Sequence, residues 1–135
     1  MLKSKVLLPS DGSDNSLKAA AYASRLMKSN PDIRLTVLVV APERSGFTEI
    51  DTSMEEKGKE IMDKTLQGFS REGLEVDKHI EKGDPASVII NYAERGEYDH
   101  IIMGSRGVSE LRGAAIGSVS HKVIHLANCR VTLVK

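Results

Sequence analysis

One stretch of the sequence decides the fold: His100-Ile101-Ile102-Met103-Gly104-Ser105-Arg106-Gly107. Its apolar first half is typical of a buried strand, and its glycines predict a turn. Beyond the turn, apolar residues recur at helical spacing: Ile116, Val119, Val123 and Leu126. The sequence here therefore predicts a strand, a glycine loop and a helix in succession.

The glycine loop has the chemistry of a phosphate site. Gly104 and Gly107 let backbone amides approach an anion, because glycine has no Cβ in the way. A helix that begins near Ser118 adds unpaired amides and the positive end of its dipole. Side chains of Arg106 and Ser118 can add further contacts. The amides predicted to bind phosphate are those of Ser105, Arg106, Gly107, Ser118 and Val119. A purely structural turn is the alternative.

Strand and helix patterns alternate along the whole chain. Strands are expected at 5–9, 35–41, 74–80, 100–103 and 131–134. Helices are expected to begin near Ser13, Met54, Pro85 and Ser118. Charged residues in 74–80 indicate an edge strand. This alternation predicts an α/β fold with a doubly wound parallel sheet, whose ligands bind beyond the carboxyl ends of the strands.

The spacing of the glycines, G-x-x-G followed nine residues later by G-S, resembles the nucleotide-binding motif of the universal stress protein family, in its ATP-binding branch. The resemblance extends to Val6–Ser13 and Gly83–Ala86 and so covers nearly the whole chain. It departs at Asn128–Val131, where the family commonly has a cysteine-proline pair. It implies one Rossmann-like domain over 1–135, with five parallel strands in the order 3-2-1-4-5 and two helices on each face.

The resemblance also implies a site for ATP, accompanied by Mg²⁺ or Mn²⁺. The Asp11 carboxylate would accept hydrogen bonds from ribose hydroxyls, although the residues alone also allow a turn-forming role or a bound cation. Val40 and Ala41 align with the adenine-contacting segment, but are otherwise ordinary core residues. The residues expected to line the site are Pro9, Ser10, Asp11, Val40, Ala41, Met103, Gly104, Ser105, Arg106, Gly107, Val108, Gly117, Ser118 and Val119.

Composition argues against several other classes of protein. The 135 residues suit one domain, and 19 basic residues balance 19 acidic ones, so a nucleic-acid-binding surface is not expected. Two Phe, three Tyr and no Trp also leave few side chains for base stacking. A single cysteine, Cys129, and the lack of an apolar run of about 20 residues predict a cytoplasmic protein that does not bind membranes.

Binding is better supported than catalysis. No lysine lies between Gly104 and Gly117, and no base is evident that would activate water, so at most slow ATP hydrolysis or autophosphorylation is expected. The predicted function is a nucleotide-dependent stress-response regulator or sensor that acts through an unknown protein partner. The final strand, 131–134, is nearly uncharged and predicts a homodimer through that edge.

Three alternatives remain open at this point. The chain could be a nucleotide-free scaffold dimer of the same family. Residues 10–14 resemble the S-G-G-x-D-S loop of ATP pyrophosphatases but depart from it at the second position, and a flavin module on a similar fold is a further possibility. His121 and His125 have a metal-compatible spacing on the last helix, but no glutamate follows His121 and no third ligand is apparent, so a solvated or subunit-facing pair is expected and no metal site is predicted.

Overall fold

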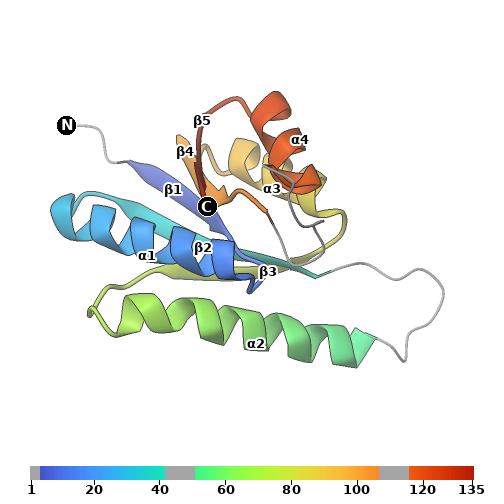
Figure 1. The fold of residues 1–135 in the computed structure, drawn as a ribbon, viewed down its shortest axis with the longest axis horizontal. Coiled ribbons are helices and arrows are strands. Elements are labelled where there is room, and N and C mark those ends of the chain that lie inside the picture. Colours follow the sequence, from blue (N-terminus) through green and yellow to red (C-terminus); the bar gives the residue numbers. More distant parts are fainter. Residues whose placement is uncertain (1–3, 42–50, 107–115) are drawn as a thin grey trace.

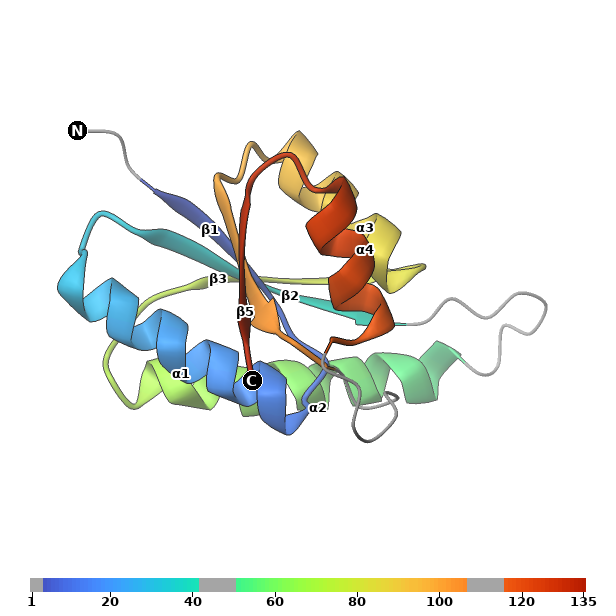
Figure 2. The ribbon, with the colours of Figure 1, turned by 45° about the horizontal axis from the view of Figure 1, so that its top comes forward.

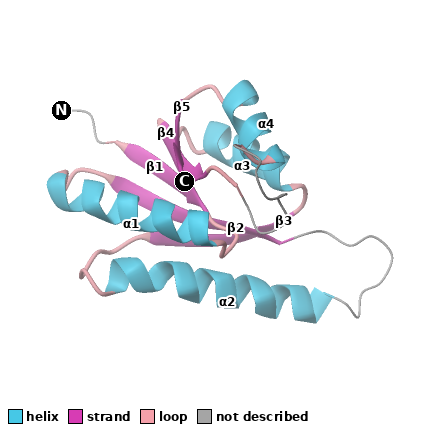
Figure 3. Ribbon diagram, in the orientation of Figure 1, coloured by secondary structure: helices cyan, strands magenta, loops and turns pink. Residues whose placement is uncertain are grey.

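The structure is a computed structural model that describes residues 4–41, 51–106 and 116–135. Strands and helices alternate along these residues (Figure 1; Figure 3). The strands are β1 (Lys5–Pro9), β2 (Arg34–Ala41), β3 (Asp77–Lys82), β4 (His100–Gly104) and β5 (Arg130–Val134). The helices are α1 (Asp14–Ser29), α2 (Asp51–Ser70), α3 (Pro85–Arg95) and α4 (Ser118–Leu126).

The strands form one parallel sheet in the order β3-β2-β1-β4-β5, which confirms the predicted doubly wound topology. Helices α1 and α2 cover one face of the sheet, and α3 and α4 cover the other (Figure 2). The chain order reverses between β1 and β4, because β2 and β3 extend the sheet to one side of β1 while β4 and β5 extend it to the other. Ligands of such folds bind at this reversal, beyond the carboxyl ends of the strands.

Two apolar layers hold the helices against the sheet. The layer under α1 and α2 is built around Leu8, Ala23, Val37 and Phe69. The layer under α3 and α4 is built around Leu7, Leu38, Ile101 and Val123. Consecutive residues of β1 contribute to opposite layers, because side chains alternate across a strand. Strands β1 and β2 are therefore buried on both sides, as their continuous apolar sequences predict.

Side chains cap two helices as the sequence predicts. The Ser13 hydroxyl accepts a hydrogen bond from the Ser16 amide at the start of α1 (3.2 Å). The Asp84 carboxylate accepts one from the Ser87 amide at the start of α3 (3.1 Å), and Pro85 occupies the first turn. The hydrogen bonds from Ser87 hold the pKa of Asp84 below its ordinary value.

The start of β3 differs from the prediction. The strand begins at Asp77 rather than at Leu74, because the preceding residues terminate α2. Gly73 adopts a left-handed conformation (φ 67°), its amide donates to the Ser70 carbonyl, and the Leu74 amide donates to the Phe69 carbonyl. Leu74 therefore belongs to the end of α2, and its side chain packs against the core cluster that contains Phe69. The prediction that β3 is an edge strand is confirmed.

The ends of two helices also differ from the predicted pattern. Helix α2 begins at Asp51 rather than at Met54, whose side chain lies outside the part of the chain that is described. In α4, Val123 is fully buried as expected, but Ile116 and Leu126 are 43% and 62% exposed. Ile116 lies two residues before the first residue of α4, and Leu126 is the last residue of the helix. Of the four apolar residues at helical spacing, Val123 is therefore the one that is fully buried.

Candidate nucleotide site at the carboxyl ends of β1 and β4

The turns that follow β1 and β4 lie against each other. Gly104, at the end of β4, approaches the backbone of α1 so closely that a Cβ built on it would lie 2.8 Å from the carbonyl carbon of Asn15. The Asn15 side-chain amide donates to the Ser105 hydroxyl (3.3 Å), and the Ser13 hydroxyl donates to the Arg106 carbonyl (3.5 Å). The two predicted motifs, far apart in the sequence, are therefore brought together.

The turn after β1 is an Asx turn. Asp11 accepts a hydrogen bond from the Ser13 amide through Oδ1 (3.0 Å), which is the turn-forming role considered for it. Gly12 has φ 79°, a conformation that other residues rarely adopt. A carboxylate has two oxygens, each with two acceptor positions, so a role in the turn and a role toward a ligand are compatible.

A group of buried hydroxyls contacts this turn on its interior side. The Ser10 hydroxyl lies 2.8 Å from the Thr65 hydroxyl and 3.2 Å from that of Ser16, and it accepts a longer hydrogen bond from the Gly12 amide (3.3 Å). Thr65 is 1% exposed and also donates to the Ile61 carbonyl (2.7 Å). These contacts join the end of β1 to α1 and α2. Thr65 was not predicted from the sequence. The signal that could have identified it is a polar residue in α2 at a position where the helical spacing predicts a core side chain.

The start of α4 is attached to the end of β4. The Gly117 amide donates to the Ser105 carbonyl (2.6 Å), and the buried Ser120 hydroxyl donates to the Gly104 carbonyl (2.8 Å). Gly117 has no side chain with which to cap α4, in contrast to the residues that precede α1 and α3. The first turn of α4 therefore begins beside the glycine turn, and no described side chain caps it.

The Ser105 amide has a different role from the one that the motif predicts. It donates to the carbonyl of Val134 in β5 (2.8 Å) and so continues the ladder between β4 and β5. This amide is already bonded within the sheet. The predicted site residues Gly107 and Val108 lie outside the described residues.

The end of β2 extends past the end of β1. The register between these strands ends at Pro9 and Leu38, where the Ser10 amide donates to the Leu38 carbonyl (2.9 Å). Val40 and Ala41 continue beyond this point, paired only with β3 in the described sheet. Val40 is half-buried and Ala41 is buried. Both lie at the same edge of the sheet as the turn after β1, as the predicted site requires.

The other predicted residues border this region. Pro9, Met103 and Gly117 are buried, whereas Arg106 is half-buried. Two more residues belong to the first turn of α4: Ser118, which is exposed, and Val119, which is half-buried. The structure thus brings together the described members of the predicted set at the carboxyl ends of three neighbouring strands.

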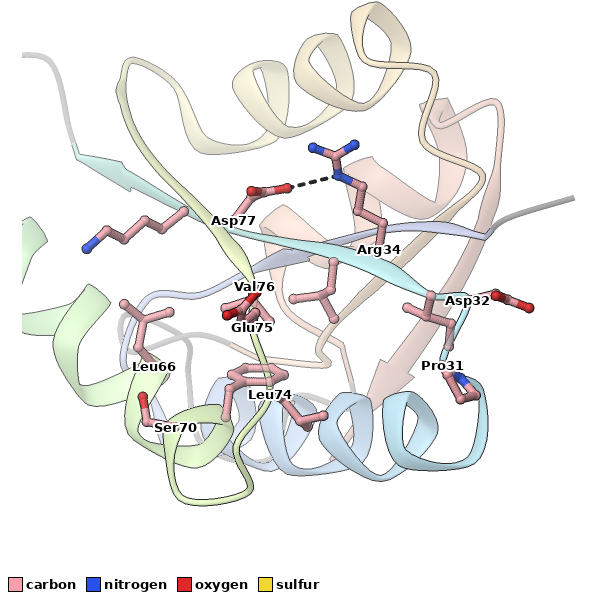
Figure 4. A pocket seen from close by; sticks show the side chains of 13 residues that line it. Pro31, Asp32, Arg34, Leu66, Ser70, Leu74, Glu75, Val76 and Asp77 are labelled. Carbon is pink, nitrogen blue, oxygen red and sulfur yellow. Dashed lines mark hydrogen bonds and ion pairs between the residues drawn. The ribbon is translucent and has the colours of Figure 1, made fainter.

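A groove of about 670 Å³ lies at the opposite end of the sheet, near the amino ends of β2 and β3 (Figure 4). The turn after α1 and the segment 74–78 line it, and Leu66 and Phe69 of α2 contribute apolar surface. An ion pair between Arg34 Nε and Asp77 Oδ2 (3.2 Å) crosses from β2 to β3 beside it. The groove is separate from the predicted site, and it lies at the end of the strands where doubly wound folds do not usually bind ligands.

Neither a cluster of three or more potential metal ligands nor a membrane span is found among the described residues. No group of three or more His, Cys, Asp and Glu side chains that could hold a metal ion occurs among them. In the same part of the chain, no helix is long and apolar enough to cross a membrane.

The fold and the site define a class of α/β proteins: a single doubly wound parallel sheet with a glycine turn at its reversal point. Residues 3–135 match the model of the universal stress protein family, and the chain belongs to this family.

Individual relatives agree with this assignment. The chain is 31% identical to universal stress protein MJ0531 of Methanocaldococcus jannaschii, over 99% of the chain and 83% of that protein. It is 32% identical to universal stress protein YxiE of Bacillus subtilis, over 97% of the chain and 98% of that protein. The solved structure of hypothetical protein MJ0577 has a TM-score of 0.87 and 28% identity, covering 100% of this chain and 97% of that one.

Two more distant structures were solved with nucleotides. A universal stress protein family member of Arabidopsis thaliana with AMP bound has a TM-score of 0.71 and 21% identity, covering 98% of this chain and 91% of that one. The Archaeoglobus fulgidus universal stress protein in complex with dAMP has a TM-score of 0.77 and 20% identity, and both chains are fully covered. At these identities the likeness to this chain is one of fold.

Proposed function

We propose that this protein binds ATP and acts as a nucleotide-dependent regulator or sensor in a stress response, through a protein partner. The observation that carries the proposal is the meeting of the turn after β1 with the glycine turn after β4, beside the start of α4. AMP and dAMP in the two structures of the same fold support an adenine nucleotide as the ligand.

Each part of the nucleotide has a proposed position. The phosphates bind near Arg106 and the first turn of α4, where a positive side chain and helix amides favour negative charge. The ribose hydroxyls donate to Asp11, and the adenine lies against Val40 and Ala41. Mg²⁺ or Mn²⁺ enters with the nucleotide, held by phosphate oxygens and water, since these ions prefer oxygen ligands.

The proposed role is binding with little turnover. The sequence between Gly104 and Gly117 has no lysine to neutralise charge on a transferred phosphate. If ATP binds one conformation of the site more tightly than another, it increases the population of that conformation. A protein partner that recognises this conformation then binds the ATP-loaded form. We place this activity in the cytoplasm, because the single cysteine, Cys129, cannot form a disulfide within the chain.

The first experiment identifies the ligand. Mass spectrometry of the supernatant after denaturing freshly purified protein is expected to detect ATP, and calorimetric titration of the stripped protein with ATP and Mg²⁺ should give micromolar binding. Absence of both retained nucleotide and micromolar binding would favour the nucleotide-free scaffold. Pyrophosphate release from ATP would instead favour the pyrophosphatase-like enzyme.

Three aspartate variants separate the possible roles of Asp11. Asp11→Asn keeps a side-chain oxygen for the Ser13 amide but removes the charge, whereas Asp11→Ala removes both. Asp14→Ala is the matched control, because it removes the same charge from the exposed first turn of α1. We expect both Asp11 variants to weaken ATP binding and Asp14→Ala to leave it nearly unchanged. Equal effects of Asp11→Ala and Asp14→Ala would contradict a direct contact with ribose.

We also propose a homodimer through β5, an edge strand that pairs only with β4 in the described sheet. The carbonyl of Val134 points toward β4, so by the alternation of a strand the amides of Val131 and Leu133 point toward the open edge. A second copy can bond to these groups and cover the half-buried apolar side chains of β5.

The dimer is tested by sedimentation equilibrium. We expect the wild type and Leu133→Ala to sediment at twice the 14.7 kDa chain mass, and Leu133→Pro to sediment as a monomer. Both variants lose the leucine side chain, but only proline removes the edge amide. A wild-type monomer at micromolar concentration, or a dimer of Leu133→Pro, would contradict pairing through this edge.

A further inference from the structure

Two histidines converge on the outer face of α4. His121 and His125 lie one helical turn apart, and their Nε2 atoms are separated by 3.2 Å. Their ring centroids are 4.4 Å apart. Both residues are exposed, while Ser120 and Val123 anchor the opposite side of the helix in the interior. The imidazoles are therefore accessible to solvent and are carried by a helix that is packed against the rest of the domain.

The separation of the two nitrogens suits a shared metal ion. Histidine nitrogens bind Zn²⁺ at about 2.0–2.1 Å, and in a tetrahedral site two such ligands lie roughly 3.3–3.4 Å apart. The observed 3.2 Å is close to this distance. A metal between the two Nε2 atoms would therefore require little rearrangement of the rings.

We propose that His121 and His125 form a two-ligand site for a divalent transition metal such as Zn²⁺ or Cu²⁺, completed by water. Imidazole favours these ions over Mg²⁺, which prefers oxygen ligands, so this site differs from that of a metal that accompanies the nucleotide. The proposal does not depend on the proposed function, because neither histidine belongs to the predicted nucleotide site.

The chemistry of the free pair is compatible with metal binding. Without metal, one Nε2 donates its hydrogen to the other, which requires different tautomers of the two rings. With metal, both Nε2 lone pairs coordinate the ion and both protons reside on Nδ1. The donor ring therefore moves its proton from Nε2 to Nδ1 through solvent, and no proton is lost from a neutral pair.

Chelation by residues four apart also affects the helix. The ion links two successive turns of α4, and this link exists only when the residues between them are helical. Because α4 starts at Ser118, directly after Gly117, the metal stabilises the helix that borders the candidate nucleotide site.

Calorimetric titration of untagged, nucleotide-free protein with ZnCl₂ tests the proposal, together with NMR of the histidine rings. We expect one Zn²⁺ per chain and changes in the ring signals of both residues. His121→Gln and His125→Gln should each weaken binding about a hundredfold, because each removes the chelate effect. His79→Gln is the matched control: His79 is also an exposed histidine, beside a carboxylate at 2.9 Å, and its loss should leave binding unchanged.

Several results would overturn the site. These are no binding at millimolar Zn²⁺, unchanged binding in the double variant His121→Gln/His125→Gln, or an effect of only one of the two single variants. Zn²⁺-dependent dimerisation that needs these histidines would show that the ion bridges two chains instead of one helix. Circular dichroism of each variant establishes that it is folded, so that a loss of binding reports the ligand itself.

Discussion

Gly104→Ala provides the sharpest test of how the candidate site is assembled. A Cβ at this position would lie 2.8 Å from the Asn15 carbonyl carbon and 2.9 Å from the Ser16 amide nitrogen. Ordinary contacts begin near 3.4 Å, so the end of β4 and the start of α1 must separate by roughly 0.6 Å. Both atoms belong to the backbone, and no side-chain rotation relieves the contact.

This separation is expected to destabilise the protein by about 1–3 kcal/mol, the usual cost of overpacking. It also displaces the bond from the Ser120 hydroxyl to the Gly104 carbonyl (2.8 Å). Gly68→Ala is the matched control, because nothing lies within 4 Å of a Cβ there. Within α2, that exchange should stabilise the protein by about 0.5–1 kcal/mol.

Urea denaturation followed by far-ultraviolet circular dichroism measures both variants at one protein concentration, since a dimer would make stability depend on it. We expect Gly104→Ala to lower the free energy of unfolding and Gly68→Ala to raise it. Gly104→Ala with the stability of the wild type would refute the reasoning, because the close approach of the two turns could then not be as described. Under the proposed function, Gly104→Ala also weakens ATP binding, while Gly68→Ala does not.

Three further substitutions test other contacts. Thr65→Val removes a hydroxyl 2.8 Å from that of Ser10 and should lower the free energy of unfolding in urea by about 1–2 kcal/mol. An unchanged free energy of unfolding would argue against the buried network. Tyr98→Phe removes a 2.8 Å bond to the Thr36 hydroxyl, with a similar expected loss by the same assay. Asp84→Ala should be less stable than the wild type at neutral pH. Folding lowers the pKa of Asp84 below its ordinary value of 3.8. The stability that Asp84 contributes is therefore present above pH 3.8 and is lost as the pH falls through the lowered pKa. The free energies of unfolding of Asp84→Ala and of the wild type should thus converge in acid.

The features of the fold that the sequence by itself determined depend on residues close together in the chain. The caps of α1 and α3 are bonds between residues three apart, and Ser13 and Asp84 reveal them without knowledge of the fold. Alternating strand and helix patterns predict the doubly wound class, and the charges of β3 indicate an edge strand. The predicted strand order came from the resemblance to the family, and the structure confirms it.

Only the tertiary structure decided the contacts between distant residues. The Ser105 amide bonds to Val134, Thr65 supports Ser10, and Gly104 approaches Asn15. None of these pairs can be derived from spacing along the chain, because each depends on how separate elements pack. The start of β3 was mispredicted for a related reason: apolar Leu74 suits a strand, but its contact with Phe69 in the core makes it the end of α2.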